Sequence, residues 1–236
     1  METEISTFEL EAVNGDMFLL AGTYTDDNVS KGIYVYKFNT DTGESDSISM
    51  VEVDNPSYIA VSGDRQFVYS VTESSDEESA VNAFSFNKKN GRLTHINSQY
   101  TRGSGPCYIT VDSKGKNVHT ANYRGGSISS FQVNADGSLD PAYSVITFRG
   151  SGPDSIRQKQ PHLHSIMHSP DGNYLFAADL GSDKLYRVSI LDTPFEGQPA
   201  IQQRSIKEYE MPPGTGPRHF DRSEERRVGK ECRSRW

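Results

Sequence analysis

The sequence predicts an all-β protein built as a β-propeller, and two observations carry this prediction. The first is a β-hairpin that recurs about every fifty residues. The second is another strand-turn-strand element that recurs between the hairpins, which gives four short strands per repeat. No segment has the apolar spacing of a helix of normal length. Four short antiparallel strands in every repeat are typical of propeller blades.

The hairpin element occurs in three complete copies, at residues 55–73, 105–123 and 160–181. Each copy has Pro as its second residue, continues through alternating apolar residues and turns at a polar segment that contains Gly, which is the pattern of a hairpin. A fourth copy begins at Gly216. The opening prolines, at 56, 106, 161 and 217, are 50, 55 and 56 residues apart.

The second element occurs at residues 32–43, 80–93 and 126–139, with a longer and looser version at 183–197. Each copy reads as a strand, then a turn with Gly, then the start of the next strand. A β-sandwich or two stacked β-domains is the alternative fold. We disfavour it because sandwiches do not repeat their sequence at the period of a blade.

Composition restricts the function. The 236 residues carry a formal net charge of −8, so the sequence predicts no nucleic-acid partner, although a few Arg and His residues can still form a local positive site. Cys107 and Cys232 are too few for a disulfide framework. No apolar run is long enough to span a membrane, and the start of the chain lacks the pattern of a signal peptide. We therefore expect a cytoplasmic protein without a membrane partner.

The last sixteen residues do not continue the fourth repeat. Residues 221–236 read DRSEERRVGKECRSRW, with six basic and four acidic residues, and follow neither a strand nor a helix period. They resemble translated cloning sequence more than a natural charged tail, which is the alternative. We therefore expect a partial propeller over residues 1–220 and a non-native tail over residues 221–236.

Several motifs in order give the sequence a specific resemblance. They are GTYT at 22–25, ANY at 121–123, PHLH at 161–164, DLGSD at 179–183 and GPRHF at 216–220. Over about residues 17–220 the chain resembles the lactonase family, and an ordered set of motifs is harder to meet by chance than a single one.

The resemblance implies a seven-bladed propeller that hydrolyses 6-phosphogluconolactone in the pentose phosphate pathway. The family also includes a fungal carboxymuconate-lactonizing enzyme. Because members run well beyond 300 residues, we expect this chain to hold about four of the seven four-stranded blades. It would then have an exposed sheet edge and lack any groups that the later blades supply.

Hydrolysis of a lactone needs a base for water, a donor for the developing oxyanion and, for a phosphorylated sugar, a cation for the phosphate. No metal or organic cofactor is required. The catalytic candidates are His162, His164 and Arg218. The two histidines lie two residues apart on a predicted strand, so we expect them to share a face. A metal-binding role for this pair would need further ligands, and none stands at suitable spacing.

Arg218 occupies the place of the histidine pair in the next repeat, so we expect them to converge around the propeller axis. Arg218 is our candidate for binding the substrate anion or the oxyanion. The predicted substrate-binding residues are His219, Glu73, Tyr123, Asn122 and Arg157. Asn122 and Asp179 occupy matching strand ends, where a polar group lines a channel mouth or satisfies the backbone.

Two other functions remain open from the sequence. A cyclase that forms a lactone from a muconate-type acid would use the same histidine and arginine chemistry. A non-catalytic propeller that binds a protein or ligand is the other, because a fold alone does not define a reaction. A serine hydrolase has little support, since the sequence has no Gly-x-Ser-x-Gly motif.

Overall fold

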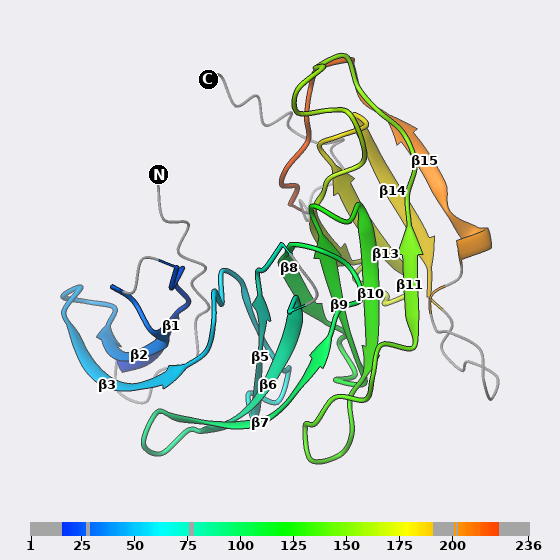
Figure 1. The fold of residues 1–236 in the computed structure, drawn as a ribbon. Helices are drawn as coiled ribbons and strands as arrows, with labels where there is room; N and C mark the ends of the chain where they lie inside the picture. Colours follow the sequence, from blue (N-terminus) through cyan, green and yellow to red (C-terminus); the bar gives the residue numbers. More distant parts are fainter. Residues whose placement is uncertain (1–15, 27–28, 76–77, 191–200, 202, 222–236) are drawn as a thin grey trace.

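The structure is a computed structural model that describes residues 16–26, 29–75, 78–190, 201 and 203–221. Within these residues it contains four antiparallel sheets that follow one another around an arc (Figure 1). The predicted all-β fold with sequential four-stranded blades is confirmed. Apart from Asp221, the predicted non-native tail lies outside the described residues.

Three sheets have four strands, which pair in sequence order. The second blade contains β4 (Ile59–Val61), β5 (Phe67–Thr72), β6 (Ala80–Asn87) and β7 (Arg92–Tyr100). The third contains β8 (Pro106–Val111), β9 (Asn117–Asn122), β10 (Ser127–Gln132) and β11 (Ser144–Thr147). The fourth contains β12 (Leu163–His168), β13 (Tyr174–Asp179), β14 (Lys184–Ser189) and β15 (Lys207–Glu210).

The first sheet has three strands among the described residues, β1 (Asp16–Ala21), β2 (Gly32–Asn39) and β3 (Ser45–Glu52). A single turn of 3-10 helix, η1 (Gln203–Ser205), precedes β15. No helix in the described part of the chain has the length and apolar character needed to cross a membrane.

One strand departs from the predicted pattern. The sequence predicts that a strand follows directly after the turn near Gly137, but β11 begins only at Ser144. Leu139 makes a single isolated bridge with Val133, and Pro141 then interrupts the segment, because proline has no N–H to donate to a ladder. The segment 216–220 has no regular secondary structure.

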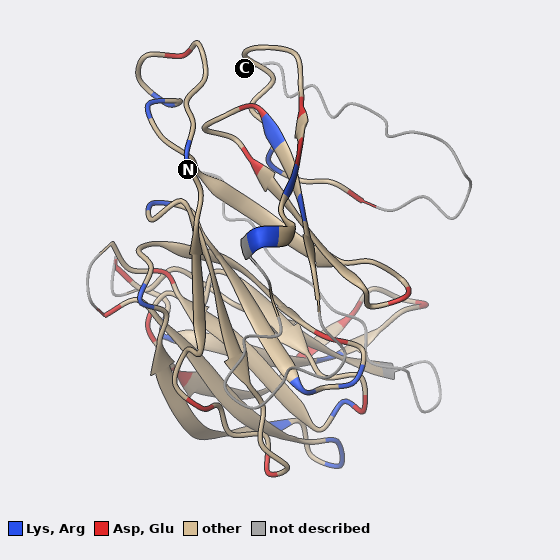
Figure 2. Cartoon of the chain, turned by 90° about the vertical axis from the view of Figure 1, so that its right-hand side faces the viewer, with Lys and Arg blue, Asp and Glu red and all other residues tan. Residues whose placement is uncertain are grey.

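In the described part of the chain the core consists of three apolar clusters, one between each pair of adjacent blades. In β5, Val68 packs toward the first blade and Tyr69 toward the third, because successive side chains point to opposite faces of a sheet. Central strands therefore bury both faces. Figure 2 shows that charged residues lie mainly in the turns and on the outer strands of the fourth blade. The inner strands thus present few charges except at their ends.

Candidate functional site

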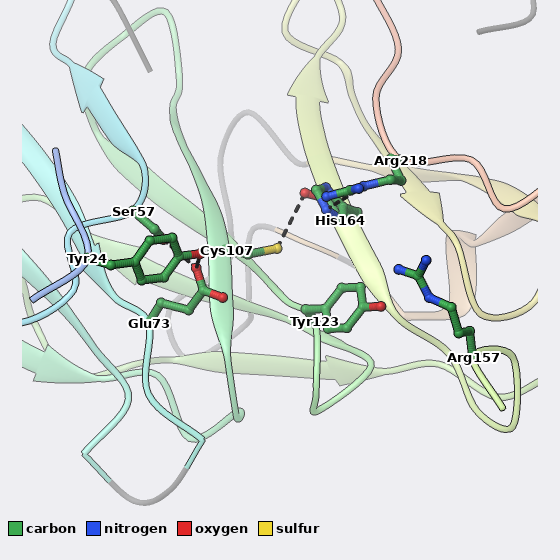
Figure 3. A pocket seen from close by; sticks show the side chains of 8 residues that line it. All are labelled: Tyr24, Ser57, Glu73, Cys107, Tyr123, Arg157, His164 and Arg218. Atoms are coloured by element: carbon green, nitrogen blue, oxygen red, sulfur yellow. Dashed lines mark hydrogen bonds between the residues drawn. The ribbon is translucent and has the colours of Figure 1, made fainter. Parts of the chain in front are cut away.

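A cavity of about 240 Å³ lies where the inner ends of the blades meet (Figure 3). Its lining is polar and comes from segments spread over almost 200 residues of the chain. The lining residues are Tyr24, Ser57, Glu73, Cys107, Tyr123, Arg157, His164 and Arg218.

Four lining residues occupy one repeated position, shortly after the opening proline of a repeat. Ser57, Cys107 and Arg218 directly follow the opening proline, and His164 stands three residues after it but matches Cys107 in the pairing of its strand. In β8 and β12 the pairing register shifts at this position, between Pro106 and Tyr108 and between Leu163 and Ser165. Cys107 and His164 are therefore the extra residues of β-bulges. A bulge changes the direction of a side chain, which explains how both reach the cavity.

These bulges correct one prediction. His162 and His164 were expected to share a face of one strand, but His162 precedes β12 and the register shifts at His164. His162 Nδ1 donates a hydrogen bond to the carbonyl oxygen of Tyr123 at 2.8 Å. The rings of these two residues stack with centroids 4.4 Å apart. His162 thus supports Tyr123 and does not line the cavity.

A second repeated position supplies three more lining residues. Glu73 and Tyr123 directly follow β5 and β9, and Tyr24 stands three residues after β1, at the matching position of the sequence repeat. Glu73 Oε2 accepts hydrogen bonds from the Tyr24 hydroxyl at 2.8 Å and from Ser57 Oγ at 2.5 Å. Burial, followed by the charge of Glu73, raises the pKa of Tyr24, so this phenol remains a donor at neutral pH.

The opposite side of the cavity is basic, as Figure 3 shows. Arg218 Nε donates a hydrogen bond to His164 Nε2 at 3.0 Å. His164 is 7% exposed. Burial, and then the nearby Arg218 and His219, lower its pKa to about 3. His164 is therefore neutral at pH 7, and its unprotonated nitrogen faces Arg218.

The remaining predicted residues lie at different distances from the cavity. The exposed His219 contacts the His164 ring edge-on, with centroids 4.8 Å apart, but is not part of the lining. Arg157 reaches the cavity from an exposed loop. Asn122 does not reach it. Its side chain is fully buried and bonds Thr120, Ser127 and Ser129.

Asp179 has a structural place beside the site. Its carboxylate is fully buried and accepts hydrogen bonds from the backbone N–H of His162 at 2.6 Å and of Gly181 at 2.9 Å. The hydroxyl of Ser182 donates to the same carboxylate. Asp179 therefore fixes the segment that leads into His164. Of the two roles expected for a polar group at this strand end, it has the one of bonding the backbone.

Sequence reasoning missed Tyr24, Ser57 and Cys107. All three occupy the same repeat positions as residues that were selected. Extending the alignment of the repeats to the first blade would have found Tyr24. Among the described residues, no group of three or more His, Cys, Asp or Glu side chains is placed to hold a metal ion.

Comparisons with known proteins agree with this architecture. A sequence model of the family described as "Lactonase, 7-bladed beta-propeller" matches residues 18–228. The sequential blades and the polar cavity at their inner ends define a β-propeller. The chain belongs to the lactonase family of seven-bladed β-propellers.

Relatives share much of the chain. A 6-phosphogluconolactonase of Bacillus subtilis is 36% identical over 84% of this chain and 54% of that protein. A solved structure from Bacteroides fragilis has a TM-score of 0.83 and 45% identity, over 90% of this chain and 59% of that chain. The periplasmic gluconolactonase of Pseudomonas aeruginosa has a TM-score of 0.79 and 32% identity, over 88% of this chain and 58% of that chain. This chain thus spans a little over half the length of the relatives it matches.

Proposed function

We propose that the protein hydrolyses a sugar lactone, 6-phosphogluconolactone to 6-phosphogluconate, at this cavity. One observation carries the proposal: Arg218 and the neutral His164 face the Glu73 carboxylate across a polar cavity. The arrangement offers a cationic end for an anionic substrate and an acceptor end for sugar hydroxyls. Relatives named 6-phosphogluconolactonase support the choice of substrate.

Binding begins with the anion. Arg157 and Arg218 are the cations of the cavity, and guanidinium groups suit phosphate and carbonyl oxygens. When Arg218 turns to the substrate, His164 Nε2 loses its hydrogen-bond donor and its lone pair becomes free. Glu73 accepts hydrogen bonds from sugar hydroxyls, while Tyr24 and Ser57 hold the carboxylate in place. Tyr123 lines the cavity between these two groups.

Hydrolysis then follows in two steps. His164 takes a proton from water as the water oxygen bonds to the lactone carbonyl carbon, and Arg218 stabilises the resulting oxyanion. The tetrahedral intermediate collapses, the bond from carbon to the ring oxygen breaks, and the proton on His164 passes to that oxygen. The products are a carboxylic acid, which ionises, and a free hydroxyl. We place this reaction in the cytoplasm.

The direct test measures hydrolysis of freshly made 6-phosphogluconolactone by this chain, with the spontaneous rate subtracted. We expect His164→Ala and Arg218→Ala to lower kcat about 100- to 1000-fold, which is the usual loss for a general base or an oxyanion donor. His95→Ala and Arg204→Ala are matched controls, because both side chains are exposed and neither lines the cavity.

Full activity in the His164 and Arg218 variants would refute these roles. If the parent chain has no activity, the assay is repeated with a protein extended to the length of the relatives. Continued inactivity there would refute the lactonase assignment. Turnover of a carboxymuconate instead would favour the cyclase.

A further inference from the structure

A buried carboxylate, that of Asp183, is hydrogen-bonded to the segments that carry the two arginines of the cavity. Asp183 is the last residue of the turn between β13 and β14, and it is only 5% exposed. Its Oδ1 accepts hydrogen bonds from the backbone N–H of Gly216 at 2.7 Å and from Gln158 Nε2 at 2.8 Å. Its Oδ2 accepts from the backbone N–H of Gly214 at 2.7 Å. Both oxygens are therefore used by donors from other segments.

The backbone at Asp183 is in a conformation that most residues avoid. Its φ is +55°, in the left-handed region, where Gly is favoured and Asp and Asn are tolerated. The corresponding turn residue of the third blade is Gly126, which has the same φ of +55°. A carboxylate in this place costs conformational energy that glycine would not. The three hydrogen bonds are the compensating feature that we find.

The segments tied by Asp183 carry the cations of the cavity. Gly216 lies two residues before Arg218, and Gln158 directly follows Arg157. Gln158 is 3% exposed, and its Oε1 accepts a hydrogen bond from the Asp154 N–H at 3.1 Å. Its Nε2 also donates to the Leu180 carbonyl at 2.8 Å. One carboxylate thus joins both arginine-bearing loops to the fourth blade.

We propose that Asp183 is a positioning residue that sets the placement of Arg218 and Arg157 at the cavity through its hydrogen bonds to the 214–216 segment and to Gln158. Its effect on catalysis rests on the proposed lactonase function, but its effect on geometry does not. A neutral amide cannot replace the carboxylate, because its NH₂ group would face an N–H donor on one side.

The test uses two variants and one control. Asp183→Asn keeps the size and tolerates the left-handed backbone, and Asp183→Gly removes the carboxylate while the backbone conformation stays favourable. Asp171→Asn is the control, since Asp171 also accepts hydrogen bonds in a turn of the same blade, at the opposite end, but only from residues of its own turn. Circular dichroism and thermal melting report whether each variant folds.

Nuclear magnetic resonance of the His164 ring gives a readout independent of substrate. In the parent, Nε2 accepts the Arg218 N–H and the ring stays neutral at acid pH. In both Asp183 variants we expect that hydrogen-bonded signature to disappear and the ring to protonate at a higher pH. We also expect kcat/KM to fall about 10- to 100-fold, as for a misplaced binding group, with KM rising more than kcat falls. Asp171→Asn should change neither.

The outcomes separate the two proposals. An unchanged His164 resonance in folded Asp183 variants would overturn the positioning role, whether or not the parent is a lactonase. A changed resonance in a parent without lactonase activity would sustain the positioning role and count against the proposed reaction. If Asp183→Asn and Asp183→Gly both fail to fold, the carboxylate serves the fold as a whole and the proposal is wrong.

Discussion

At the scale of single residues, the main finding is that two side chains selected for separate roles are partners of each other. Arg218 donates to the nitrogen that His164 would use as a base. Burial, and then the charge of Arg218, lower the pKa of His164, and the hydrogen bond directs the lone pair of Nε2 at a cation. An anionic substrate that binds Arg218 both frees this lone pair and cancels part of the charge that lowers the pKa of His164.

This coupling predicts a difference between two pH profiles. The profile of kcat/KM reports the free enzyme, where the pKa of His164 is about 3, and the profile of kcat reports the complex. Because the bound anion offsets the charge of Arg218, the pKa of His164 rises in the complex. We therefore expect the acid limb of kcat to lie at higher pH than the acid limb of kcat/KM. In steady-state kinetics from pH 4 to 8, at about half-unit steps, the titration of His164 should lower kcat toward acid pH but should not lower kcat/KM.

His95→Gln should reproduce both profiles, because this exposed histidine lies on the outer strand β7. Coincident acid limbs in the parent would contradict the predicted exchange of partners at Arg218.

At the scale of elements, a pair of histidines lies between the third and fourth blades. His119 on β9 is fully buried, and its ring lies 5.2 Å from the ring of His168 on β12. His119 Nδ1 bonds Ser130, while His168 Nδ1 bonds Thr110. Burial, and then the neighbouring His168, hold the pKa of His119 well below its ordinary value of 6.5. Burial also lowers the pKa of His168, although Asp112 opposes the shift.

This buried pair predicts a loss of stability in acid. Both histidines are neutral when folded and take up protons when unfolded, so their contribution is complete above about pH 6.5 and falls as the pH drops below it. For His119, whose folded pKa is well below 6.5, the free energy of unfolding falls by about 1.4 kcal/mol per pH unit as the pH drops below that value. His119→Gln should therefore lose less stability between pH 7.5 and pH 5 than the parent, as measured by urea unfolding.

Because His95→Gln removes an exposed histidine instead, it should leave the parent's pH dependence unchanged. If the parent and His119→Gln lose the same free energy of unfolding between pH 7.5 and pH 5, His119 does not contribute to the loss of stability in acid.

At the scale of the whole molecule, each blade depends on close contact with its neighbours. Gly137 lies in the turn between β10 and β11 of the third blade, and this turn contacts the second blade. A Cβ on Gly137 would lie 2.1 Å from the ring of Phe67, and the φ of Gly137 is +84°. The Tyr69 hydroxyl donates to the Gly137 carbonyl at 3.1 Å. Such contacts make the stability of one blade depend on the next.

We expect Gly137→Ala to destabilise the contact between the second and third blades. The added methyl group overlaps the Phe67 ring, and overpacking of this kind costs about 1–3 kcal/mol. The left-handed backbone adds about 1–2 kcal/mol. Gly115→Ala is the matched control, since Gly115 has a φ of +65° but no atom within 4 Å of its Cβ position. Thermal unfolding should show a larger loss for Gly137→Ala than for Gly115→Ala, and equal losses would contradict the docking contact.

Local patterns in the sequence were sufficient to predict the blades. Alternating apolar residues, opening prolines and Gly-containing turns predict hairpins, and their spacing predicts a propeller, because strand pairing between neighbours in the chain depends mainly on local signals. The same repeat positions predict that His164, Arg218, Glu73 and Tyr123 approach one axis. The three lining residues that were missed occupy those positions too.

Only the tertiary structure decided which of the candidate residues reach the cavity. Regular alternation placed His162 and His164 together, but a bulge in β12 separates them, and a bulge depends on the pairing partner rather than on the strand's own sequence. Asn122 is structural because its side chain bonds Thr120 on its own strand and Ser127 and Ser129 on the neighbouring β10. Asp183 is structural because its donors come from distant loops. The sequence by itself therefore determined the repeating elements and the candidate set, while contacts between distant segments determined orientation, burial and the bond from Arg218 to His164.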